Sequence, residues 1–66
     1  MDSLPQDPAI LVSSVNMLLR DGEFDNLDSL CYYFDEDPLG FRAKLIVYGF
    51  EYSEQQNQIR PIGYND

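Results

Sequence analysis

Carboxylates are the most numerous side chains in this sequence that could carry chemistry. Twelve acidic residues stand against four basic ones, and the central acids are Asp21, Glu23, Asp25, Asp28, Asp35, Glu36 and Asp37. Oxygen ligands of this kind suit Ca²⁺ or Mg²⁺. However, the glycine of the run 21–25 is second, whereas an EF-hand loop requires it sixth. We therefore interpret the acids as a solvated rim that caps helices, and we expect no metal site.

The single thiol, Cys31, is the second group that could react. A catalytic thiol needs a base or a lowered pKa, and the sequence contains no histidine to help. One cysteine also excludes an internal disulfide and gives too few ligands for structural zinc. Arg20 and Asp21 could recognise a carboxylate or a phosphate, but we favour the interpretation that Arg20 complements a helix end. These residues predict a protein that is not an enzyme and has no cofactor.

Two Asp-Pro pairs mark where the helices that position these groups begin. In Asp7-Pro8 and again in Asp37-Pro38, the aspartate can cap free amides and the proline fits the first helical position. A glycine then follows each segment, at Gly22 and Gly49, where the left-handed closing conformation costs little. The pattern predicts helices over about 8–21 and 38–48.

A shorter helix is expected between these two. Leu27, Leu30, Cys31 and Phe34 follow the i, i+3, i+4, i+7 spacing of one helical face. Because an acidic or amide side chain precedes them as a cap, this spacing predicts a helix over about 26–35.

The periodicity changes to strand-like alternation near the C-terminus. Two short runs separated by a polar turn predict a β-hairpin over about 50–60, which Pro61 should end. A chain of 66 residues is too short for two cores. We therefore expect one domain, 1–66, of the mainly α class: a three-helix bundle, helix-turn-helix-like, with a short C-terminal β-hairpin.

The net charge of −8 limits the partners that this protein can have. A negative field repels the phosphates whose neutralisation supplies most nucleic-acid affinity, and it repels anionic membrane surfaces for the same reason. The longest apolar stretch, Ala9 to Val12, is far short of the roughly 20 residues that span a bilayer. The N-terminal residues MDSLPQDP lack the pattern of a signal peptide. We expect a cytoplasmic protein that does not bind membranes and does not favour DNA.

The three helices carry more apolar surface than their shared core can bury. The residues outside the predicted core stripes are candidates for contact with a partner: Ile10, Met17, Tyr32, Tyr33, Leu39, Ala43, Ile46 and Val47. Aromatic and aliphatic side chains of this kind anchor interfaces, and exposed apolar area usually marks contact. The alternative is that the hairpin covers the second face of the third helix and that the tyrosines simply lie on the surface.

Four segments together resemble a family of short bacterial proteins of unknown function. That family has the pattern LPxDPxxLLSxVNxxLRD, then LxxLC, then GYxY and NQF, which are matched here at Leu4 to Asp21, Leu27 to Cys31, Gly49 to Tyr52 and Asn57 to Ile59. Phe50 replaces the usual tyrosine, and Ile59 replaces the usual phenylalanine. The resemblance implies a shared fold and a bacterial source, and it implies no activity.

Two classes of function fit these features. The first is a small protein-interaction or regulatory module, which either self-associates, with a homodimer as one form, or binds one protein partner through the apolar residues. The second is a winged-helix-like, transcription-associated domain, or a mimic of nucleic acid, because three helices and a hairpin also describe that fold. No specific small molecule is implied by any motif in the chain.

Overall fold

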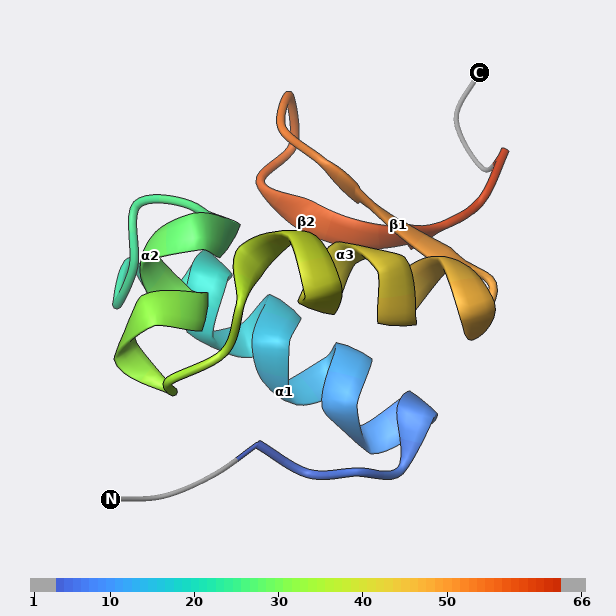
Figure 1. Ribbon diagram of the computed structural model, residues 1–66. Coiled ribbons are helices and arrows are strands. Elements are labelled where there is room, and N and C mark those ends of the chain that lie inside the picture. The colour runs from blue at the N-terminus through green and yellow to red at the C-terminus, as the bar shows by residue number, and fades with distance from the viewer. Residues whose placement is uncertain (1–3, 64–66) are drawn as a thin grey trace.

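The fold is a small helical domain closed by a hairpin, and the computed structural model describes residues 4–63 of it. Residues 1–3 and 64–66, the ends of the predicted domain, lie outside the described residues. The elements in chain order are α1 (Pro8–Arg20), α2 (Leu27–Tyr33), α3 (Pro38–Val47), β1 (Phe50–Ser53) and β2 (Gln58–Pro61). Figure 1 shows α2 at one end and the hairpin packed along the longer helices. The predicted class, mainly α with a C-terminal hairpin, is confirmed.

Side-chain caps set the start of each helix. Asp7 accepts hydrogen bonds from the amides of Ala9 and Ile10 at 3.0 and 3.3 Å, and Asp37 accepts one from the amide of Gly40 at 2.8 Å. Asn26 caps α2 in the same way through the amide of Ser29 at 2.9 Å. These caps satisfy amides that the first turn leaves without partners. The predicted starts of all three helices therefore hold to within one residue.

The helices end slightly earlier than predicted. The residues predicted to end α1 and α3, Asp21 and Tyr48, are their C-caps. In α2 the difference is two residues, because Asp35 takes the left-handed conformation with φ 63°. The amide of Glu36 then bonds to the carbonyl of Cys31 at 2.8 Å, which closes the last turn.

Pro61 is the last residue of β2, so the strand ends there as expected, although the proline itself still takes part in the ladder. Pro61 pairs with Phe50 in the antiparallel register. The next pair outward is hydrogen-bonded, since the amide of Ile62 donates to the carbonyl of Gly49 at 3.1 Å. Hydrogen-bonded and non-hydrogen-bonded pairs alternate in antiparallel strands, so the position of Pro61 needs no amide directed at β1. A proline can stand there without loss of a ladder bond.

The core lies where the three helices meet β2. Its buried members are Leu11, Val12, Val15, Leu19, Leu27, Leu30, Cys31, Phe41, Leu45 and Ile59. The hairpin contributes one residue to this set, Ile59, which is only 2% exposed. The hairpin therefore belongs to the core and completes it. Among residues 4–63, no helix is long and apolar enough to cross a bilayer.

Candidate functional site

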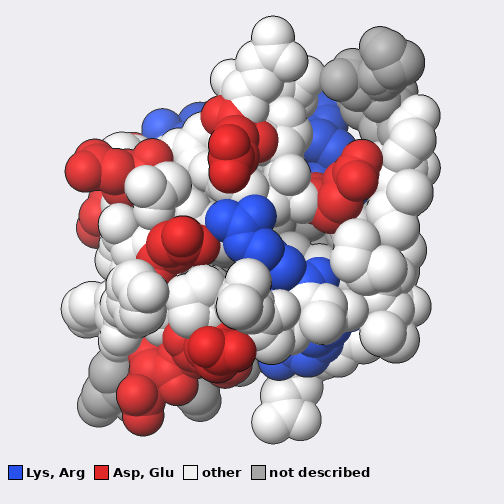
Figure 2. Space-filling model, turned by 45° about the horizontal axis from the view of Figure 1, so that its top comes forward, with Lys and Arg blue, Asp and Glu red and all other residues white. Residues whose placement is uncertain are grey.

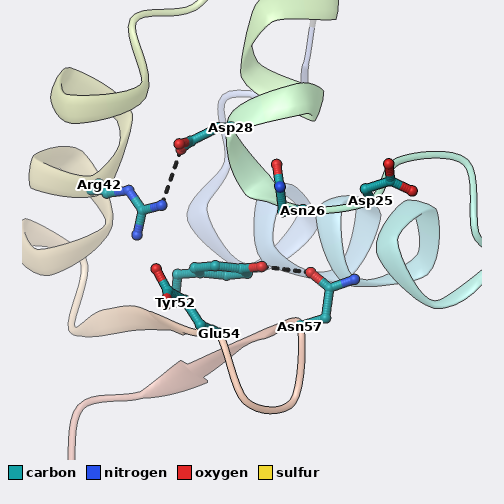
Figure 3. A pocket seen from close by; sticks show the side chains of 7 residues that line it. All are labelled: Asp25, Asn26, Asp28, Arg42, Tyr52, Glu54 and Asn57. Atoms are coloured by element: carbon teal, nitrogen blue, oxygen red, sulfur yellow. Dashed lines mark hydrogen bonds and ion pairs between the residues drawn. The ribbon is translucent and has the colours of Figure 1, made fainter.

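A polar hollow lies beside the start of α2, between α3 and the hairpin (Figure 3). Its lining consists of Asp25, Asn26, Asp28, Arg42, Tyr52, Glu54 and Asn57. Nη2 of Arg42 donates to Oδ1 of Asp28 at 3.0 Å, and the guanidinium lies 5.1 Å from the centre of the Tyr52 ring. The Tyr52 hydroxyl donates to Oδ1 of Asn57 at 2.5 Å.

These interactions connect the elements that surround the hollow. Arg42 belongs to α3 and Asp28 to α2, while Tyr52 belongs to β1, so the chain of contacts ties three elements together. The ion pair is partly exposed, with side chains 33% and 49% accessible, which limits its contribution to about 1 kcal/mol at most. Within residues 4–63, no group of three or more acidic or thiol side chains is placed to hold a metal ion.

The Cys31 thiol is enclosed in the core. Its side chain is fully buried, and burial raises its pKa to about 11, with a further contribution from the negative charges of Asp28 and Glu36. The thiol is therefore neutral at physiological pH, which lowers its reactivity as a nucleophile. This agrees with its predicted place on the apolar stripe of the second helix.

Asn16 makes a contact that periodicity did not predict. Its Nδ2 donates to the carbonyl of Ile59 at 3.0 Å, and its Oδ1 accepts from the amide of Ile59 at 2.6 Å. In addition, Nε2 of Gln58 donates a hydrogen bond to the main-chain carbonyl of Asn16 at 3.1 Å. The only signal in the sequence was the family-like pattern, which contains both the asparagine of VN and the glutamine of NQ.

The third helix carries the main exposed apolar surface. Leu39 is 77% exposed, Ile46 50% and Val47 83%, and Ala43 between them is also exposed. We call these four residues the α3 face. The opposite side of the helix carries Phe41 and Leu45, both buried in the core. The question left open by the sequence thus has an answer: the hairpin does not cover the α3 face.

The other predicted contact residues are exposed but do not join the α3 face. Ile10 is 56% exposed and Met17 52%. They are seven residues apart and lie opposite the buried stripe of α1, so they share one face of that helix. Because α1 and α3 both turn their buried sides to one core, the exposed face of α1 points to a different part of the surface.

The two tyrosines of α2 lie at the surface with different surroundings. Tyr32 is 70% exposed and Tyr33 61%. The ring of Tyr33 packs edge-on against Phe34, with centroids 5.0 Å apart, and in a tilted arrangement against Phe24, with centroids 5.4 Å apart. Offset and edge-on aromatic pairs of this kind are stabilising in themselves. Tyr33 therefore has an intramolecular role, which its outward position in the predicted helix did not indicate.

Charge is distributed unevenly around these surfaces. In Figure 2 most acidic atoms lie in the left half of the view, which is the side that α2 occupies in Figure 1. By contrast, α3 contains Arg42 and Lys44 and no acidic residue. Nζ of Lys44 lies 5.2 Å from the centre of the Phe41 ring, which is a favourable cation–π distance. The α3 face is thus flanked by cations in a chain whose net charge is −8.

The fold and its surface define a class: a small, mainly α domain with a C-terminal hairpin, whose α3 face is open to solvent. The chain belongs to the family described as Domain of unknown function (DUF4250), whose family model matches residues 5–59. This confirms the resemblance to an uncharacterised family. No curated protein and no solved structure gives a significant match to the chain.

Proposed function

We propose that this domain is a non-catalytic interaction module that binds a protein surface through the α3 face. The observation that supports the proposal is the exposure of Leu39, Ile46 and Val47, at 77%, 50% and 83%, on one side of a single helix. Scattered apolar residues are ordinary on a surface, but a contiguous apolar helix face is a common mode of recognition. The positions i, i+4, i+7 and i+8 are those of a helix that inserts its apolar face into a groove.

The winged-helix alternative has less support from the same helix. A recognition helix needs free cations, yet Arg42 is paired with Asp28 at 3.0 Å and Lys44 lies over Phe41. Apolar side chains occupy the outward positions between them. A DNA-binding role and a nucleic-acid mimic therefore stay hypotheses from the sequence, as does the cytoplasmic location.

The test is the double variant Ile46→Gln, Val47→Gln. Because both side chains are largely in solvent, we expect the free energy of unfolding to change by no more than about 0.5 kcal/mol per site. Binding to a partner that uses the α3 face should weaken by at least tenfold, since about 1.5–3 kcal/mol is typical for burying one such side chain. The measurement is titration calorimetry with a purified partner, identified first by capture from the source cytosol.

A matched control is available on the first helix. The double variant Ile10→Gln, Met17→Gln removes two apolar side chains of similar exposure, 56% and 52%, from a different surface. This control should bind as the unaltered protein does. Equal affinity of all three proteins for the purified partner would contradict the proposal, and so would unfolding of the α3-face variant, which would show that the face is part of the core.

A further inference from the structure

We propose that the α3 face binds a second copy of this chain, with the two α3 helices packed antiparallel across a two-fold axis at Ala43. This inference rests on the proposed function, because it names the partner of that same face. It is supported by three properties of the helix: the symmetry of its outward positions, its local charge, and the area that it offers.

The outward positions of α3 are complementary to themselves. Leu39 lies four residues before Ala43, and Val47 lies four residues after it. Across a two-fold axis at Ala43, antiparallel helices therefore place Leu39 of one copy beside Val47 of the other. Contacts of this kind, in which one patch serves both partners, characterise two-fold dimers.

Small residues provide the space that the larger ones need. Ile46 lies three residues after Ala43, and Gly40 lies three residues before it, so each isoleucine would lie at the level of a glycine of the other copy. Gly40 is exposed, and a Cβ placed there would have as its nearest neighbours only side-chain atoms of Asp37, the closest at 3.2 Å. Ala43 at the axis lets the two helices approach to the 8–10 Å spacing of packed helices.

Local charge also favours α3 over the rest of the surface as the interface between two copies of the chain. Each copy has a net charge of −8, so contact through the acidic side of the molecule would be repulsive. Within Pro38–Val47 there are two cations and no acid. One of these cations, Arg42, is already balanced by Asp28 at 3.0 Å. The acids that directly precede the helix are Asp35, Glu36 and Asp37. In the antiparallel arrangement these acids of the two copies would lie at opposite ends of the interface, so they stay apart.

The available area predicts a weak dimer. A stable interface buries about 800 Å² per partner, which is roughly a fifth of the 4386 Å² that the chain exposes. A buried aliphatic side chain accounts for about 60–120 Å², so the four residues of the α3 face supply about 250–500 Å². Interfaces at this lower end are transient. We expect a dissociation constant on the order of 10–100 µM.

The decisive experiment introduces a positive or a negative charge at Ala43, the residue at the proposed two-fold axis. Ala43→Lys and Ala43→Glu are made separately, and both residues are good helix formers at an exposed site. Each variant brings like charges together in a dimer, so each should stay at 7.6 kDa in sedimentation equilibrium up to about 1 mM, far above the dissociation constant expected for the unaltered chain. An equimolar mixture should form a species of twice that mass, because opposite charges then meet.

Two further measurements sharpen this experiment. Ser13→Lys adds the same charge to the exposed surface of α1, and this variant should dimerise as the unaltered protein does. Added salt should strengthen the dimer, since it screens repulsion between two acidic copies. A basic partner would show the opposite dependence.

Each outcome bears on the proposal. A chain that remains monomeric up to about 1 mM overturns the second-copy proposal, while the proposed function still stands or falls on the separate binding test with Ile46→Gln, Val47→Gln. Dimers that persist in both single Ala43 variants place the interface elsewhere and also overturn it. Restored dimers in the mixture alone support the antiparallel arrangement at Ala43.

Discussion

Replacing Asn16 with alanine should lower the free energy of unfolding by about 2–4 kcal/mol. The side-chain amide of Asn16 makes two hydrogen bonds to the main chain of Ile59, one at 3.0 Å and one at 2.6 Å. Ile59 is only 2% exposed, so water has little access to the amide and carbonyl that the substitution would leave unpaired. Each buried polar group without a partner costs about 1–3 kcal/mol.

This loss is large for a domain of this size. Small single cores without disulfides or metals rarely exceed about 3–5 kcal/mol of stability. The Asn16→Ala variant should therefore be substantially unfolded at room temperature. Urea denaturation followed by circular dichroism measures the change, with Ser13→Ala, an exposed site on the same helix, as the control expected within about 0.5 kcal/mol.

A third variant separates the two hydrogen bonds. Asn16→Asp keeps an oxygen that can accept from the amide of Ile59, but it places a carboxylate against the carbonyl of Ile59. We expect this variant to be destabilised as well, and to recover part of its stability when acid protonates the carboxylate. A loss below about 1 kcal/mol in Asn16→Ala would mean that water or a shift of β2 replaces the asparagine.

The same two bonds determine which way β2 faces. A residue in an antiparallel strand directs its amide and carbonyl to the same side, and both groups of Ile59 point toward Asn16 of α1. The pair of Ile59 with Tyr52 is therefore not hydrogen-bonded within the hairpin. The side chain of Asn16 takes the place of a third strand along β2 and protects that edge.

The starts of the helices were predictable because their causes are local. Asp7 and Asp37 act on amides only two or three residues away. The division of α3 into two sides was predictable for a similar reason, since about half a helical turn separates the buried Phe41 and Leu45 from Leu39 and Val47. Whether the hairpin would cover the outward side was not predictable from this spacing.

The remaining features depend on contacts between distant residues. Asn16 and Ile59 are 43 positions apart, and no pattern in α1 reports where β2 will lie. Arg42 and Asp28 are 14 positions apart, and their pairing depends on how α2 meets α3. The early end of α2 depends on Asp35, which takes the left-handed backbone conformation. Aspartate adopts this conformation more readily than most residues do. Local spacing leaves each of these undetermined.

The Cys31 thiol should react at least about 100-fold more slowly than a thiol in the unfolded chain at pH 7.5. The reacting species is the thiolate, and a pKa raised from 9.0 to about 11 lowers its fraction by about two powers of ten. Complete burial of the side chain slows the reaction further, because a reagent must wait for the core to open. Labelling with iodoacetamide, followed by mass spectrometry in the presence and absence of urea, measures the ratio.

The same pKa gives stability a defined dependence on alkaline pH. Between about pH 9 and pH 11 the unfolded chain loses the Cys31 proton while the folded chain keeps it. The unfolded state then binds fewer protons, so the free energy of unfolding falls as the pH rises through this window. Cys31→Ala removes this titration and should flatten the fall, although the cavity lowers stability at every pH. An equal slope in both proteins, or rapid labelling of the folded chain, would show that the thiol reaches solvent and that α2 opens without global unfolding.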